Sequence, residues 1–220
     1  MHKNISGVCV MGVNKGTSGT HTVREGRLVR TYSLGGCFGF ATDTAFHDGK
    51  VLTKATYRHI TKSKLARLLM MIQASHQQSA VHFLGLDLQS QAAYEAISEE
   101  GMVRPGEKSP PLIYSLNILD FNPPNFTLEV SCINENNYFF QDLIHKIGLQ
   151  LKSNAVCTHM RCIRYGPWTL QHALLRKHWT LEHIINNINI SWPLIRGIKP
   201  ESPSLRDIDT DKYSEDVAEG

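Results

Sequence analysis

No stretch of the 220 residues approaches the ~20 consecutive apolar residues that a membrane-spanning helix needs. The start of the chain, MHKNISGVCV, lacks the basic and apolar segments of a secretory signal, and it is not an Arg/Ser-rich amphipathic transit peptide. The sequence therefore predicts no membrane span. Two alternatives remain for its location: a cytosolic protein, or one whose targeting segment has been lost.

Paired cysteines and clustered metal ligands are also missing. The five cysteines form no CxxC pair, which argues against a zinc ribbon and favours reduced, mostly buried thiols in a reducing compartment. The histidine pairs 76/82 and 178/183 have no Cys/His/Asp cluster at ligand spacing around them. No G-x-S-x-G occurs either, so nothing supports a serine hydrolase.

The glycine-rich segment LGGCFG is not a phosphate-binding loop. Its glycines, Gly35, Gly36 and Gly39, do not have the G-x-G-x-x-G spacing, and no helix start follows them. We therefore expect these glycines in a strand or a β-bulge.

The formal charge of +3 hides an asymmetry along the chain. Residues 199–220 carry a net charge of −4, which leaves +7 on the first 198 residues. A basic body is compatible with a polyanion partner, although many enzymes that never touch nucleic acid are as basic. We expect 1–198 to form the folded domain and 199–220, rich in Pro, Ser and Asp, to be a disordered acidic tail.

Hydrophobic periodicity predicts strands interleaved irregularly with helices. Expected strands cover 5–11, 28–40, 112–119, 126–133 and 155–164; expected helices start at Thr61 and cover 89–99, 140–151, 168–175 and 180–188; a loop is expected at 12–20. The connector DFNPPN supplies turn residues for an antiparallel pair. This order predicts an α+β domain with a mixed or antiparallel sheet flanked by helices. Because the first strand begins almost at residue 1, we expect the sheet to be incomplete at the N-terminus.

Four segments carry a family resemblance, in the same order and with matching spacing. They are ISGVCVMGVNKG, LVRTYSLGGCFGFATDTAFHDGK, the block from Tyr57 to Pro105 with KSPPLIYS after it, and DLIHKIGLQLKSNAVCTHMRCIRYGPWTLQHALL. Over residues 2–190 the chain resembles the TruB branch of the pseudouridine synthases, and within it the mitochondrial, mRNA-modifying group. So long a collinear match is more specific than any single motif.

The resemblance implies an RNA-modifying isomerase. Such an enzyme flips a uridine out of the RNA, breaks its C–N glycosidic bond and rejoins the uracil through carbon. In the family an aspartate attacks covalently, as an activated carboxylate can, and neither a metal nor a nucleotide cofactor is needed. The implied partners are mitochondrial mRNA or tRNA and RNA-granule proteins, and the implied location is the mitochondrial matrix.

Carried over by position, Tyr32 is the tyrosine that stacks on the flipped base, and Arg30 beside it is a phosphate contact. The plain alternative is an ordinary strand aromatic. The spacing from Tyr32 to Thr42-Asp43-Thr44 favours the functional role.

The same alignment assigns residues of the strand at 155–164. Met160 takes the place of the apolar residue at the floor of the pocket. Arg161 keeps the first of two adjacent family arginines, Cys162 replaces the second, and Arg164 retains basic character nearby. We expect Arg161 and Arg164 to contact RNA.

Two positions depart from the family pattern. His2 stands where the nucleophilic aspartate is expected, and Gln141 stands where its partner arginine is expected. A buried arginine without its carboxylate would be costly, so a neutral glutamine suits a site without the aspartate. Three explanations are open: a late start site in a longer product, a truncated isoform, or a degenerate synthase that only binds RNA. The rival functions are a non-catalytic RNA-binding or RNA-granule assembly protein and an unstable remnant.

Overall fold

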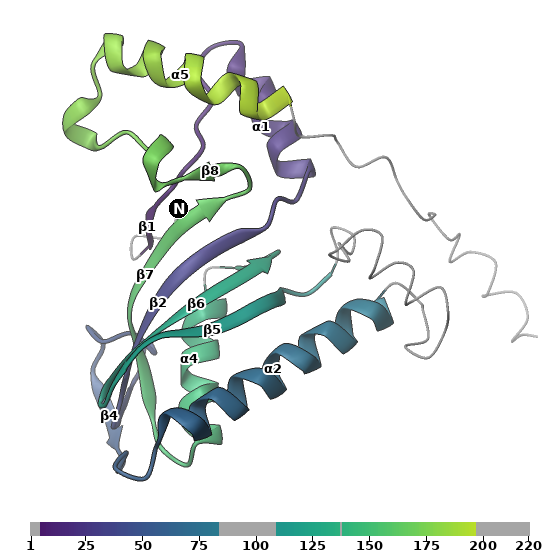
Figure 1. The fold of residues 1–220 in the computed structure, drawn as a ribbon. Helices are drawn as coiled ribbons and strands as arrows, with labels where there is room; N and C mark the ends of the chain where they lie inside the picture. The colour runs from purple at the N-terminus through teal and green to yellow at the C-terminus, as the bar shows by residue number, and fades with distance from the viewer. Residues whose placement is uncertain (1–4, 84–108, 137, 197–220) are drawn as a thin grey trace, which may run out of the picture.

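A computed structural model describes residues 5–83, 109–136 and 138–196 (Figure 1). The strands are β1 (Ile5–Gly7), β2 (Arg30–Phe38), β3 (Phe40–Thr42), β4 (Val51–Lys54), β5 (Leu112–Asn122), β6 (Asn125–Ile133), β7 (Ala155–Tyr165) and β8 (Trp168–Thr169). The helices are α1 (Gly16–Glu25), α2 (Lys62–Phe83), α4 (Phe139–Gln150) and α5 (Leu181–Arg196), with short 3-10 turns at Leu170–His172 and Arg176–His178. The protein is therefore an α+β domain, as the sequence predicts.

One mixed sheet organises the molecule, in the order β1-β7-β2-β6-β5, with β8 added to β7. β2 lies in the middle and pairs antiparallel with both β6 and β7. β1 pairs parallel with β7, with Ile5 opposite Met160. The predicted antiparallel pair at 112–119 and 126–133 is confirmed as β5 and β6.

The core forms between this sheet and two amphipathic helices. One face of β6 carries Phe126, Leu128, Val130 and Cys132, and all four are buried. One stripe of α4 buries Phe140, Leu143, Ile144 and Ile147 in the same cluster, to which α2 adds Leu65 and Leu69. Both helical predictions are therefore confirmed, because spacings of three and four residues align apolar side chains on one helix face.

Two of the three glycines of LGGCFG lie in the sheet, as predicted. Gly35 and Gly36 belong to β2, and a register shift between them marks a bulge against β7. A Cβ on Gly36 would lie 2.2 Å from the ring of Phe126, so only glycine fits there. Gly39 follows with φ +108°, a backbone conformation that suits glycine alone.

Two local predictions are wrong. Residues 16–20, the second half of the expected loop at 12–20, belong to α1 instead. Val23 of α1 is only 3% exposed, so tertiary packing overrides the weak helix propensity of the Gly, Ser and Thr residues in this segment. The expected helix at 168–175 is instead β8 and a 3-10 turn, because Trp168 pairs with Tyr165 across the chain reversal at Gly166, where φ is +54°. The expected helix at 89–99 lies outside the described residues.

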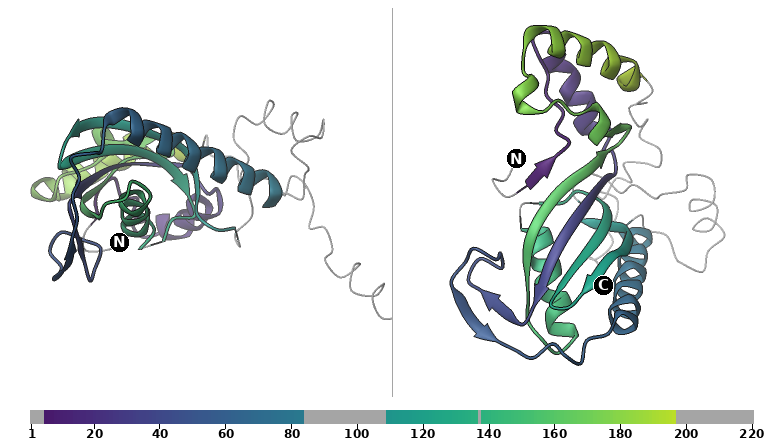
Figure 2. Two further views of the ribbon diagram at one scale, coloured as in Figure 1. Left: turned by 90° about the horizontal axis from the view of Figure 1, so that it is seen from below. Right: turned by 60° about the vertical axis from the view of Figure 1, so that its left-hand side comes forward.

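The first and last predicted elements differ in length. The strand expected at 5–11 ends at Gly7, where φ reaches +106° and the backbone turns away from β7. The helix expected at 180–188 continues to Arg196 as α5. Figure 2 shows α1 and α5 together at one end of the molecule and the β3–β4 hairpin projecting at the other.

The structure also bears on membrane and metal binding. None of the helices in the described ranges is long and apolar enough to cross a membrane. Within the same ranges, no three His, Cys, Asp or Glu side chains come together as a metal site. All five cysteines are free thiols, of which Cys132, Cys157 and Cys162 are buried.

The turn after β3 offers a first prediction. The buried Thr42 hydroxyl donates a hydrogen bond to the Phe46 carbonyl at 2.7 Å. We expect Thr42→Val to lower the free energy of unfolding by about 1 kcal/mol, because this bond is lost while the side-chain shape is kept. Urea unfolding measures the change. The exposed Thr56→Val is the control and should stay within about 0.5 kcal/mol; equal effects of both variants would contradict the assignment.

Candidate functional site

Tyr32 is the third residue of β2 and points into the interior. It is 4% exposed, and its ring packs against that of Phe140 with 4.5 Å between centroids. Its hydroxyl donates a hydrogen bond to Glu135 Oε1 at 2.7 Å. The ring is thus held at both ends, by an aromatic contact and by a buried acceptor.

Arg30, two residues earlier on β2, belongs to the same cluster. Its guanidinium forms an ion pair with Glu135, donates a hydrogen bond to the Tyr165 hydroxyl at 3.0 Å and lies 4.3 Å from the centre of the Tyr165 ring. Its Nε is buried and has no hydrogen-bond partner among the described residues. In this structure the Arg30 guanidinium contacts Glu135 and Tyr165, which occupy the positions that a phosphate would need.

Glu135 is the residue that joins Arg30 to Tyr32, and sequence reasoning missed it. It follows β6 directly after Asn134, whose positive φ of 56° turns the chain at the end of the strand. The Glu135 side chain is only 5% exposed. A Glu two residues after a buried strand carries no specific signal, so only the fold reveals its contacts.

The buried carboxylate dominates the electrostatics of this cluster. Burial, and then the charge of Glu135, raise the pKa of Tyr32 above its usual value, so its phenol is neutral near pH 7. Burial alone would lower the pKa of Arg30, but Glu135 and Tyr165 outweigh it and raise the pKa. The cluster therefore joins the Glu135 carboxylate, the Arg30 guanidinium and a neutral Tyr32 phenol.

Gln141 and Met160 lie near this cluster. Gln141 is 5% exposed in the first turn of α4, directly after the Phe140 that touches Tyr32. Met160 is 1% exposed on β7, opposite Leu34 of β2. Tyr32 and Met160 thus belong to one core cluster, which also contains Phe140, the residue directly before Gln141.

The predicted RNA contacts on β7 lie apart from this buried cluster. Arg161 and Arg164 are exposed, and Arg164 donates a hydrogen bond from Nε to the Gly166 carbonyl at 2.8 Å. Cys162, between them, is buried opposite Tyr32. His2, the expected position of the nucleophile, lies outside the described residues.

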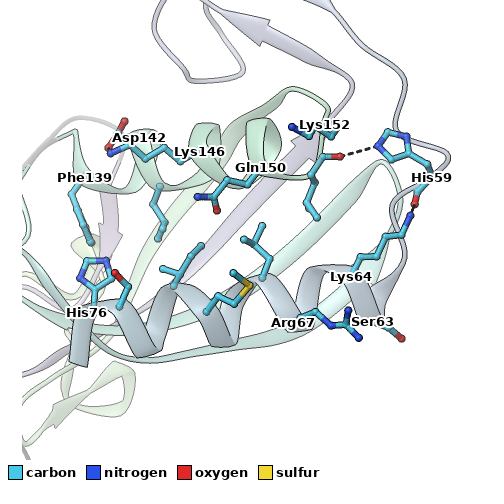
Figure 3. Close-up of a pocket in the computed structure, with 16 residues that line it drawn as sticks. His59, Ser63, Lys64, Arg67, His76, Phe139, Asp142, Lys146, Gln150 and Lys152 are labelled. Atoms are coloured by element: carbon cyan, nitrogen blue, oxygen red, sulfur yellow. Dashed lines mark hydrogen bonds and ion pairs between the residues drawn. The ribbon is translucent and has the colours of Figure 1, made fainter. Parts of the chain in front are cut away.

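A groove of about 1040 Å³ separates α2 from α4 (Figure 3). Leu68, Met71, Ile72, Leu143 and Leu151 form its apolar lining, and charged or aromatic side chains form its rim and ends. The two helices are tied at one end by His59, whose Nε2 lies 2.8 Å from the Leu151 carbonyl oxygen. At the other end the rings of His76 and Phe139 meet edge to face, 6.4 Å apart.

Comparison with protein families gives one match. The family described as "TruB family pseudouridylate synthase (N terminal domain)" matches residues 2–138, which is more than half of the chain. The matched residues include Arg30, Tyr32 and Glu135 of the buried cluster.

Curated relatives agree with this match. The chain is 43% identical over 202 residues to the mitochondrial pseudouridylate synthase TRUB2 of Homo sapiens, covering 91% of this chain and 61% of the relative. The Mus musculus protein of that name is 41% identical over 201 residues, covering 91% of this chain and 60% of the relative. The chain thus spans about three fifths of the length of these relatives.

Among solved structures, a chain of the archaeal box H/ACA sRNP Nop10-Cbf5 complex is similar with a TM-score of 0.49 and 14% sequence identity. The similarity covers 86% of this chain and 42% of that one.

Proposed function

The chain belongs to the TruB family of pseudouridylate synthases, and from this premise we propose that it binds mitochondrial RNA and isomerises a uridine to pseudouridine. The proposed reaction flips the nucleotide, breaks its C–N bond and forms a C–C bond to the same sugar, so no cofactor or metal is consumed. The observation that carries the proposal is the family match over residues 2–138, which include Arg30, Tyr32 and Glu135.

Each side chain of the cluster has a proposed role. Tyr32 stacks on the flipped uracil, Met160 forms the apolar floor of the uracil pocket, and Arg30 contacts a phosphate. Because the Tyr32 ring is covered and Arg30 is paired in the described state, RNA binding must expose the ring and exchange Glu135 for a phosphate at Arg30. Arg161 and Arg164, exposed on β7, provide further phosphate contacts.

A second candidate function rests on Gln141. The expected arginine would pair with a carboxylate nucleophile, but this buried position holds a neutral amide. Such a site can bind a base without attacking it, since a neutral amide can donate a hydrogen bond to a carboxylate but lacks the positive charge of the expected arginine. The second candidate is therefore a non-catalytic RNA-binding or RNA-granule assembly protein built on the same fold.

Tritium release from 5-tritiated uridine separates the two candidates. We would compare the unmodified chain, His2→Asp and His2→Asp/Gln141→Arg on a long mitochondrial-type transcript under single-turnover conditions. Release by the unmodified chain is the expected result for a synthase. RNA binding without release would overturn isomerisation by this chain and establish the binding protein, and recovery in the double variant would trace the loss to residues 2 and 141.

The proposed location is the mitochondrial matrix, and the proposed substrates are mitochondrial mRNA or tRNA. These proposals follow from the relatives, whose names place them in mitochondria. Proteins of RNA granules are the proposed protein partners. Fractionation of cells that express a C-terminally tagged chain checks the location: protease protection inside intact inner membranes is expected, and a cytosolic pool alone would contradict it.

A further inference from the structure

The positive charge of the folded body is concentrated in one segment. From Lys50 to Phe83 the chain has six Lys or Arg residues, three His and no Asp or Glu. These 34 residues carry +6 of the +7 found in the first 198 residues, so the other 164 are nearly neutral. A segregation of this kind creates a local positive potential that attracts a polyanion.

Two of these six cations line the groove between α2 and α4, where two further lysines join them. Lys64 and Arg67 come from α2, and Lys146 and Lys152 from α4 and the residues just after it (Figure 3). Against these four cations the lining contains one carboxylate, Asp142, which is 2.6 Å from Lys146. Within the described part of the chain, Arg67 and Lys152 have no acidic partner at ion-pair distance.

The start of α2 adds to the same field. Its first turn contains no acidic residue and instead carries Lys62 and Lys64. The N-terminus of a helix is the positive end of its dipole, so cations there are unfavourable unless an anion lies nearby. Lys50, Lys54 and Arg58 continue the exposed basic surface beyond the groove toward the β3–β4 hairpin.

The opposite end of the groove is aromatic and leads to the Tyr32 cluster. Phe139 contacts His76 there and lies 5.4 Å from Phe140, which is 4.5 Å from Tyr32, all as centroid distances. Burial, the largest influence, lowers the pKa of His76, so its ring is neutral near pH 7. A row of rings thus connects the groove with the proposed base-binding tyrosine.

We propose that the groove between α2 and α4 binds single-stranded RNA next to the target uridine. The phosphates lie at the end of the groove that carries Lys64, Arg67 and Lys152, and a base lies at the His76–Phe139 end. A positive groove with aromatic side chains is the combination that single-strand-binding proteins use. Four Lys or Arg side chains against one carboxylate favour a polyanion, and the His76–Phe139 end, on which a base can stack, favours RNA over an acidic protein helix. This inference rests on the proposed RNA binding and names where the flanking RNA lies.

The test measures how affinity depends on salt. The probe is a fluorescein-labelled oligouridylate of about 20 nucleotides, long enough to fill one groove. Each phosphate contact contributes ~0.7 to the slope of log K against log salt for a single strand, so Arg67→Gln/Lys152→Gln should reduce the slope by about 1.4. At ~0.1 M salt this corresponds to an affinity loss of about 25-fold. Both side chains are exposed, so folding should be unaffected, and thermal unfolding verifies this.

The matched control is Lys15→Gln/Lys177→Gln, which removes the same charge from exposed positions before α1 and before α5. Its slope should equal that of the unmodified protein. As a readout independent of substitution, 4-thiouridine in the probe should crosslink to peptides from 57–76 and 139–152.

Three results would overturn the groove assignment. The first is an equal slope for the groove variant and the unmodified protein, and the second is no binding of oligouridylate at all. The third is a groove variant that keeps RNA binding but loses binding of polyglutamate, which would identify an acidic protein as the occupant. The isomerase proposal fails separately: oligouridylate held in the groove by a chain that releases no tritium supports the groove and refutes the chemistry.

Discussion

Replacing Gln141 alone with arginine is expected to lower the free energy of unfolding by about 3 kcal/mol. Gln141 is 5% exposed in the first turn of α4, and its neighbour Phe140 is fully buried. An arginine there would place a cation in the interior, while the one carboxylate of the Tyr32 cluster, Glu135, is already paired with Arg30. Urea unfolding followed by circular dichroism measures the loss.

The control for this substitution is Gln150→Arg at the other end of α4. Gln150 is exposed, so the same chemical change should alter stability by no more than about 0.5 kcal/mol. Adding His2→Asp to Gln141→Arg should recover more than half of the loss, because the resemblance implies that residue 2 faces residue 141. A Gln141→Arg variant as stable as the parent would show that a carboxylate already accepts the cation, and this would contradict the neutral site.

Removing the carboxylate of Glu135 is expected to have an effect of similar size. Glu135→Ala leaves the Arg30 guanidinium without its counter-ion and the Tyr32 hydroxyl without its acceptor. Because the Arg30 side chain is about one third exposed, at 34%, we expect the lower end of the range for a broken buried pair, about 3 kcal/mol. Glu129→Ala, on β6 itself, is the control and should cost about 0.5 kcal/mol or less.

The pH dependence of stability tests the same contact. The pKa of Tyr32 is raised in the folded state, so as the pH rises the phenol ionises first in the unfolded state. The contribution of Tyr32 to the free energy of unfolding is therefore lost as the pH rises above about 10. Glu135→Gln removes the negative charge and should lower the pKa of Tyr32, which weakens this loss. Spectrophotometric titration against Tyr32→Phe isolates the phenol, and an unchanged titration in Glu135→Gln would contradict the contact.

Periodicity predicted the parts of the fold in which local pattern and packing agree. The alternation in β6 and the stripe of α4 are strong because each buries one face against the same core. The segment after Gly12 was predicted wrongly because a partner far along the chain stabilises it: α1 and α5 line one pocket together with Trp168. The lengths of β1 and α5 depend on Gly7 and on packing, which single-sequence patterns do not report.

The candidate site was predictable only where the resemblance supplies positions. Tyr32 and Met160 come from chain segments far apart, and the structure places both in one core cluster with Phe140, which precedes Gln141. Glu135 was not predictable, because its importance lies in two contacts across 103 and 105 residues rather than in a motif. The groove was missed for a similar reason: its lining comes in two halves, from about 59–76 and 139–152.

The parallel pairing of β1 with β7 fixes an order of assembly. Ile5 meets Met160, so β1 has no described partner until more than 150 further residues have been synthesised. Bringing together contacts so distant along the chain is slow, whereas the β5–β6 hairpin closes locally. During translation at ~5–20 residues per second, β1 therefore waits many seconds for β7. The period in which this strand is unpaired thus falls within the synthesis of the chain.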